Sequence, residues 1–293
     1  MDIISICTID TWTDRLSPLE TNATLAKLES GNIIFCPQLK FNLQEEEERS
    51  FFEPHHLKRK TKNISFNVCS KQLKGLHSKF QQQSRLKSSL ARFARDASTL
   101  MSKLFPHYAI ELANGQTSYY PVQIKNQTLS PLKDDSRLHI DAFPTNPIQG
   151  KRIFRLFCNI NPFGQPRVWR IGEQFIDLAQ RFLPKIAKPI PGSAKALYWA
   201  GITKGIRTDY DHIMLAINHQ MKLDNDYQNQ VKSKELAFPA GTSWIVATDA
   251  LSHAVISGQY ILEQTFLLPT TAMQDQTQAP LRILENLMGR TLI

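Results

Sequence analysis

The feature that most constrains the fold is a series of short strand-like segments after Leu104. Each segment is four to nine residues long and rich in β-branched and aromatic side chains, and turn-forming stretches such as 144–147 and 239–241 separate many of them. Only two helical stretches interrupt the series, at 173–183 and 209–221. Many strands with few interleaved helices favour an antiparallel double-sheet core over a parallel α/β fold. The predicted strands are residues 119–125, 138–143, 152–160, 167–171, 243–248, 254–257 and 260–268.

The preceding part of the chain has a different texture. Residues 32–36 form a short strand-like run, and the acidic stretch 45–48 is interpreted as a solvated face. Residues 84–104 place apolar side chains three and four positions apart, which predicts one amphipathic helix. We expect residues 1–110 to form an N-terminal α+β region packed on a catalytic core of residues 111–293, with a helical insertion near 173–230 and the whole forming one globular unit. The apolar stripe of the helix is Leu86, Leu90, Phe93, Ala97, Leu100 and Leu104.

Positive charge is concentrated around this helix. Between Lys58 and Lys103 there are twelve Lys and Arg residues and one acid, Asp96, whereas the whole chain carries a net charge of only +9. Such a segment indicates an anionic partner: a membrane surface, an anionic substrate or a nucleic acid. Alternatively, the helix packs on the body of the protein and its basic face only lies in water.

Three features point to a cytoplasmic protein. No apolar run approaches the roughly 18 residues of a membrane span. The first residues, MDIISICTIDTW, lack the basic start of a signal peptide. The four cysteines are scattered without metal-ligand spacing, which is typical of free thiols in a reducing compartment.

The candidate chemistry begins with His139 and Asp141 on the predicted strand 138–143. Alternation along a strand directs residues two apart to the same face. Non-haem Fe(II) oxygenases need two imidazoles and one carboxylate on one face of the metal, with the remaining positions left for co-substrate and O₂. This pair supplies two of the three ligands.

The third ligand is expected on another strand far downstream. His212 and His219 lie in a helical stretch and are interpreted as packing or surface residues. His253 opens the second of two strand-like runs joined by a turn, so we predict His139, Asp141 and His253 as the catalytic iron ligands.

Such an oxygenase also needs a cation for the far carboxylate of 2-oxoglutarate, because a buried carboxylate must be paired. About ten residues after His253 the chain offers Gln264 but no Arg or Lys. Arg155, on the strand 152–160, is therefore the predicted anchor, and Asn159 on the same face could add a donor. The Gln264 region is the alternative.

Three segments resemble the bacterial Kdo hydroxylase family: HIDAFPTNPIQGKRIFRLFCNINP, RTDYDHIMLAINHQMKLDNDYQ and FPAGTSWIVATDALSHAVISGQYILEQTF. They span residues 138–269, nearly half of the chain. The resemblance implies a double-stranded β-helix (jelly-roll) core with flanking helices and dependence on Fe(II), 2-oxoglutarate and O₂. It also implies hydroxylation at C3 of the 3-deoxy-D-manno-octulosonic acid (Kdo) sugar of Kdo-lipid A.

A substrate of this kind implies a peripheral enzyme at the anionic, cytoplasmic face of the inner membrane. Arg170, Lys204 and Arg207 are candidate cations for the sugar carboxylate or nearby phosphates.

Other functions stay open from sequence alone. The same scaffold could hydroxylate a protein side chain or a nucleobase, or be a catalytically inactive jelly roll. A nucleic-acid-binding protein could use residues 58–103 for phosphate contacts. That segment has no helix-turn-helix or zinc motif and few aromatics, so no nucleic-acid partner is expected. No feature of the sequence indicates an oligomeric state.

Overall fold

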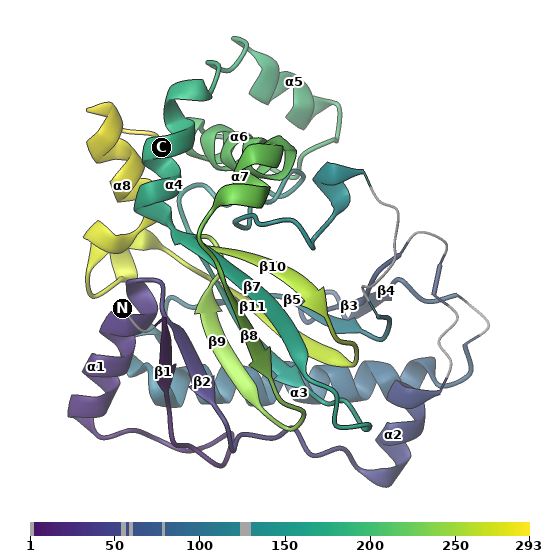
Figure 1. The fold of residues 1–293 in the computed structure, drawn as a ribbon. Helices are drawn as coiled ribbons and strands as arrows, with labels where there is room; N and C mark the ends of the chain where they lie inside the picture. Colours follow the sequence, from purple (N-terminus) through teal and green to yellow (C-terminus); the bar gives the residue numbers. More distant parts are fainter. Residues whose placement is uncertain (1–2, 54–56, 59–60, 78–79, 124–129) are drawn as a thin grey trace.

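Two β-sheets face each other in the computed structural model of the chain (Figure 1). It describes residues 3–53, 57–58, 61–77, 80–123 and 130–293. The large sheet has eight strands in the order β1-β2-β9-β6-β11-β5-β3-β4, and the small sheet has the order β10-β7-β8. All neighbouring strands are antiparallel except the parallel pair β1–β2. The strands are β1 Ile4–Ile6, β2 Ile33–Cys36, β3 Ile64–Asn67, β4 Gln72–Lys74, β5 Ala113–Tyr120, β6 Arg152–Asn159, β7 Arg167–Gln174, β8 Lys234–Phe238, β9 Ser243–Ala247, β10 Leu251–Ser257 and β11 Ile261–Leu268.

These two facing sheets confirm the predicted double-sheet core. Strands β6, β7, β9, β10 and β11 lie where the sequence pattern places them. Strand β5 begins six residues before the predicted segment 119–125, whose end falls at residues 124–125, outside the described part of the chain. The prediction of a regular strand at 138–143 is wrong: this segment makes only an isolated bridge, between His139 and His253.

An aromatic cluster fills the space between the sheets at one end. Phe157 from β6 stacks on Trp244 from β9 with ring centroids 5.2 Å apart, and Phe238 from β8 stacks on the same indole at 4.1 Å. Trp169 from β7 meets Phe157 edge-on at 5.0 Å. Aromatic side chains each bury a large area, so this cluster holds the two sheets at a fixed spacing.

Helices α1 and α3 pack on the large sheet, and helices α4 to α7 gather at one end of the two sheets (Figure 1). The longest helix, α3, contacts β3, β5 and β11, and its apolar stripe is buried as predicted. Helices α4 to α7 all lie between β7 and β8 in the chain, and the stretches predicted at 173–183 and 209–221 are α4 and α6. No helix in the described ranges is long and apolar enough to cross a membrane. The helices are α1 Pro18–Glu29, α2 Glu45–Phe52, α3 Gln83–Leu104, α4 Phe175–Phe182, α5 Ser193–Trp199, α6 Asp209–Leu223, α7 Asn225–Gln230 and α8 Pro280–Met288.

The acidic and basic segments of the N-terminal region partly neutralise each other. Glu47 is buried in α2, and its carboxylate accepts two hydrogen bonds from Arg92 of α3, at 3.1 and 2.6 Å. Glu46 forms a longer, more exposed pair with Arg85 at 3.4 Å. The interpretation of residues 45–48 as a solvated face is therefore wrong at Glu47. Three of the segment's cations, Arg59, Lys60 and Lys79, lie outside the described residues.

Candidate active site

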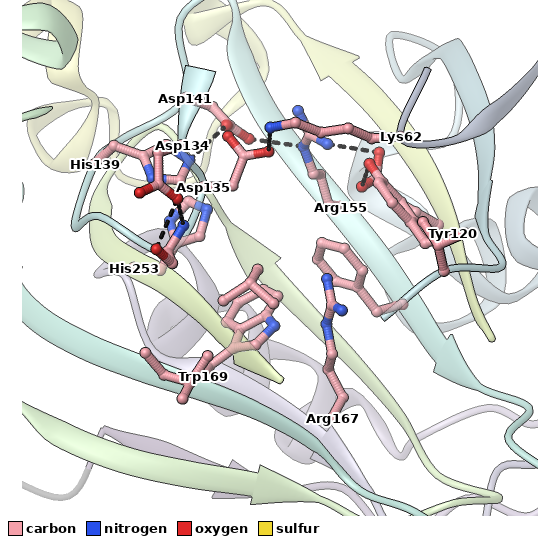
Figure 2. Close-up of a pocket in the computed structure, with 16 residues that line it drawn as sticks. Lys62, Tyr120, Asp134, Asp135, His139, Asp141, Arg155, Arg167, Trp169 and His253 are labelled. Atoms are coloured by element: carbon pink, nitrogen blue, oxygen red, sulfur yellow. Dashed lines mark hydrogen bonds and ion pairs between the residues drawn. The ribbon is translucent and has the colours of Figure 1, made fainter. Parts of the chain in front are cut away.

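A cavity of about 390 Å³ opens between the two sheets (Figure 2). Strands β5, β6 and β11 form one wall, and β7 and β10 form the facing wall. The segment 134–141, which precedes and includes the predicted ligand pair, borders one end. The side chains used below are Lys62, Tyr120, Asp135, His139, Asp141, Arg155, Arg167, Trp169, His253 and Glu263, all of which line this cavity.

Two backbone hydrogen bonds join the segments that carry the two histidines. The amide of His139 donates to the carbonyl of His253 at 3.0 Å, and the amide of His253 donates back at 2.9 Å. The two imidazole rings consequently lie with their centroids 4.7 Å apart. Asp141 is held in place by its own amide, which donates to the carbonyl of Thr248 at 2.8 Å.

The side chains of the three predicted ligands converge. One ligand atom from each of His139, Asp141 and His253 lies within 4.8 Å of the others, and no other set of three such residues gathers in the described ranges. Each ring donates from Nδ1 to a backbone carbonyl, at 2.8 Å for His139 and 2.9 Å for His253. These bonds fix the tautomer that leaves Nε2 as the acceptor, as metal-ligating histidines require.

The electrostatics of the three groups also suit a cation. Burial, with the neighbouring His253, lowers the pKa of His139 to about 3, and burial lowers the pKa of His253. Burial opposes ionisation of Asp141, but the Arg155 guanidinium, together with the two histidines and Thr248, holds the pKa of that carboxyl below its usual value. Two neutral imidazoles and one carboxylate are therefore present at pH 7, the protonation state that metal ligation needs.

The other candidate histidines lie elsewhere. The Nε2 atom of His212 donates to the carbonyl of Ala187 at 3.0 Å on the surface of α6. His219, on the same helix, does not line the cavity.

Arg155 points into the cavity but is already paired with two carboxylates. Its Nε lies 2.7 Å from Oδ2 of Asp141, an ion pair whose angle is poor for a hydrogen bond, and its Nη1 donates to Glu263 at 2.6 Å. Glu263 also accepts from Tyr120 at 2.9 Å and from Thr265 at 3.2 Å. Arg155 thus holds the Asp141 carboxylate instead of standing free for a co-substrate.

Arg167 is the cation that the sequence reading missed. Its side chain is buried and reaches into the cavity from β7 (Figure 2), where Nη1 donates to the carbonyl of Gly258 at 2.8 Å. Its Nε has no hydrogen-bond partner, and no carboxylate among the described residues forms an ion pair with it. The sequence could have indicated this role, because Arg167 lies two and four residues before Trp169 and Ile171, and strand alternation places all three on the same inward face.

Asn159 and Gln264 do not line the cavity. Asn159 is buried at the end of β6, where its side-chain amide donates to the carbonyls of Gln165 and Phe238, both at 3.0 Å. Gln264 faces the other side of β11 and accepts a hydrogen bond from Thr117 at 2.6 Å. Both residues are occupied by the fold itself, which argues against the predicted co-substrate role of either.

The predicted sugar-binding cations also lie outside the cavity lining. Arg170 alternates with Trp169 to the other face of β7 and bonds Ser233 and the carbonyl of Gln228. Lys204 is exposed, and Arg207 donates to the carbonyl of Pro144. Besides Arg155 and Arg167, Lys62 is the cation among the described residues that lines the cavity, and it pairs with Asp135 at 2.9 Å.

Two histidines and one carboxylate at the open end of a double-sheet core define a non-haem Fe(II) and 2-oxoglutarate-dependent dioxygenase. Comparison with known proteins gives the family. The profile of the 3-deoxy-D-manno-oct-2-ulosonic acid (Kdo) hydroxylases matches residues 11–291. The chain belongs to the Kdo hydroxylase family.

This chain is similar to the Kdo hydroxylase KdoO, of which several structures are solved. The two sequences are 40% identical, and the match covers 99% of this chain and 97% of KdoO. The complex of KdoO with α-ketoglutarate (2-oxoglutarate) and Fe(III) superposes with a TM-score of 0.94, and the cobalt(II) complex with 0.95. The apo structure also gives 0.94. No curated protein sequence matches this chain significantly.

Proposed function

We propose that this chain hydroxylates C3 of the Kdo sugar of Kdo-lipid A, with iron held by His139, Asp141 and His253. The observation that carries the proposal is the convergence of these three groups, with both Nε2 atoms free, at one end of a cavity in a Kdo hydroxylase fold. Bound iron would supply the activation of O₂: one oxygen atom would enter the substrate as the C3 hydroxyl, and the other would enter the succinate that forms as 2-oxoglutarate loses CO₂.

The residues around the ligands orient them. Arg155 holds one oxygen of Asp141, which leaves the other facing the histidines: Oδ1 lies 3.9 Å from Nε2 of His139. Trp169 stacks on the ring of His253 with centroids 5.2 Å apart, which limits rotation of that ring. Ligands held this way need little rearrangement when the metal binds.

Arg167 is proposed as the anchor for the far carboxylate of 2-oxoglutarate. A buried guanidinium without a paired acid is costly, and an incoming carboxylate would offset that cost with charge-assisted hydrogen bonds. Burial lowers the pKa of Arg167 to about 10, so the group still carries its charge at neutral pH.

The sugar would enter from the side of Lys62 and the segment 134–136, which border the same cavity. Because Kdo-lipid A is lipid-anchored, the enzyme would work peripherally at the anionic, cytoplasmic face of the inner membrane. The four cysteines are all free thiols, which fits a reducing compartment.

The metal site is tested by single replacement of each ligand. His139→Ala, Asp141→Ala and His253→Ala should each lower Kdo hydroxylation more than a hundredfold, because an incomplete ligand set loses the metal. The readouts are the visible absorption band of the anaerobic Fe(II)–2-oxoglutarate complex and mass analysis of the lipid A product.

His212→Ala is the matched control, since it removes a histidine outside the cavity and should leave both readouts unchanged. Full activity in any of the three ligand variants would remove that residue from the site. Iron-dependent turnover of 2-oxoglutarate without a mass change on Kdo-lipid A would overturn the proposed substrate.

A further inference from the structure

The insertion between β7 and β8 exposes an unusual concentration of large apolar side chains. Five of the fourteen exposed large hydrophobic residues of the described chain fall within residues 190–206. Trp199 is the most exposed of them, with 80% of its surface accessible. Monomeric soluble proteins rarely expose large apolar side chains in groups, so this segment is a candidate surface for binding a partner. The five are Ile190 (77%), Tyr198 (43%), Trp199 (80%), Ile202 (54%) and Ile206 (41%).

The same stretch is basic and contains no acid. Residues 178–208 hold six Lys and Arg residues and neither Asp nor Glu. Arg181 and Lys185 pair with acids from neighbouring segments. Lys188, Lys195 and Lys204 form no ion pair with any described residue. Trp, Tyr and Ile interleaved with lysines are the composition of a segment that lies in a membrane interface.

The charge identifies the occupant. A second copy of the chain across a two-fold axis would bring two uncompensated basic patches together, which costs free energy. An anionic bilayer accepts both components, because its headgroups attract the lysines and its acyl boundary receives the indole.

The position of this segment relative to the active site fits a lipid-linked substrate. The amide of Lys204 donates to the carbonyl of Thr145 at 2.9 Å, and Arg207 donates to the carbonyl of Pro144. Pro144 follows Asp141 by three residues, which span at most about 11 Å. The segment is therefore braced against the chain that carries two of the three proposed iron ligands.

We propose that residues 186–207, the α5 segment, dock the protein on an anionic lipid bilayer by inserting Tyr198 and Trp199 into the headgroup region. The inference deepens the proposed function, since it assigns the surface from which a lipid-linked sugar reaches the cavity. It is an alternative to membrane docking through the basic segment around helix α3, which the sequence left open. Helix α3 lies at the opposite end of the molecule from α5 (Figure 1), and two of its arginines are paired with glutamates of α2.

Trp199 provides a direct readout in the full-length protein. Trp169 and Trp244 are buried and Trp12 packs between Phe41 and Phe93, so Trp199 is the most accessible tryptophan. Vesicles of phosphatidylethanolamine and phosphatidylglycerol should blue-shift its fluorescence and protect it from acrylamide. Phospholipids brominated near the headgroup should quench it.

The double variant Tyr198→Ser, Trp199→Ser should bind these vesicles at least tenfold more weakly in co-sedimentation. Ile110→Ser is the matched control, because Ile110 is 94% exposed outside the α5 segment, and it should bind as wild type. Both variants should keep the Fe(II)–2-oxoglutarate absorption band, which shows that the fold and the metal site are intact.

Three results would overturn the inference. The double variant could bind vesicles as tightly as wild type. Binding could instead be lost only on reversal to Glu of the four cations that line a groove at α3 and form no ion pair with any described residue: Lys71, Lys87, Arg95 and Lys103. The wild type could form a dimer in ultracentrifugation that the double variant does not form, without binding vesicles. A different result would separate the two proposals. If wild type binds vesicles and the double variant does not, but the enzyme fails to hydroxylate Kdo, the proposed function is refuted and the docking surface still stands.

Discussion

The two walls of the cavity each contribute one arginine, largely buried at Arg155 and almost fully buried at Arg167, and the two arginines differ in their partners. Arg155, on β6 of the large sheet, contacts the carboxylates of Asp141 and Glu263. Arg167, on β7 of the small sheet, donates one hydrogen bond to a backbone carbonyl, and its Nε has no hydrogen-bond partner among the described residues. A buried cation with paired acids builds a site, whereas one without them is positioned to receive a ligand.

The acid–base properties of the two groups follow the same division. Burial disfavours the charged form of both. At Arg155 the nearby Asp141 and Glu263 carboxylates outweigh burial and raise the pKa of the guanidinium. At Arg167 burial dominates and lowers the pKa to about 10. The difference fits the two proposed roles, a positioning residue at Arg155 and a ligand-binding residue at Arg167, and three substitutions test them.

The largest effect is expected from Arg155→Ala. Removing one member of a buried ion-pair network leaves the acids uncompensated, so the free energy of unfolding should fall by about 3–5 kcal/mol. Urea unfolding of the metal-free protein measures this change. Arg181→Ala, which removes an arginine from an exposed ion pair, is the control and should cost less than about 1 kcal/mol. Unchanged stability in Arg155→Ala would mean that the network does not hold the β6 wall.

Arg167→Met should have the opposite character. It replaces an unpaired buried charge by an apolar side chain of similar length. The free energy of unfolding of the metal-free protein should therefore fall by about 1 kcal/mol at most. The affinity for 2-oxoglutarate should fall by about 2–5 kcal/mol, roughly 30- to several-thousand-fold, because a charge-assisted contact to a carboxylate is lost.

Titration of the anaerobic Fe(II)–2-oxoglutarate absorption band measures that affinity. Arg170→Met, on the outward face of the same strand, is the matched control and should bind 2-oxoglutarate as wild type. Normal affinity in Arg167→Met, with a large loss in an Arg155 variant that remains folded, would restore Arg155 as the anchor.

The smallest effect is expected from Tyr120→Phe. The substitution keeps the ring beside Arg167 and removes only the hydroxyl that donates to Glu263. A hydrogen bond to a charged group contributes about 1.5–3 kcal/mol, so unfolding should become easier by about that amount. Affinity for 2-oxoglutarate should change less than threefold, and a tenfold loss would place Tyr120 in the binding wall.

The sequence by itself determined the features that depend on local spacing. His139 and Asp141, two residues apart, point to the same place in the structure as predicted. They do so even though their segment forms a single bridge and no regular strand. The apolar stripe from Leu86 to Leu104 specifies helix α3, because three- and four-residue steps return to one face at 3.6 residues per turn. The prediction of His253 as the third ligand rested on its place at the start of a strand-like run.

Only the tertiary structure decided which charges are paired, because ion pairs join segments that are distant in the chain. Arg155 is neutralised by Glu263, 108 residues away, and Arg92 of α3 by Glu47, 45 residues away. A sequence pattern shows that a cation is present but not which acid reaches it. Sheet register leaves Arg167 without an acid, and packing leaves Trp199 exposed, so these two residues acquired their proposed roles only when the chain was folded.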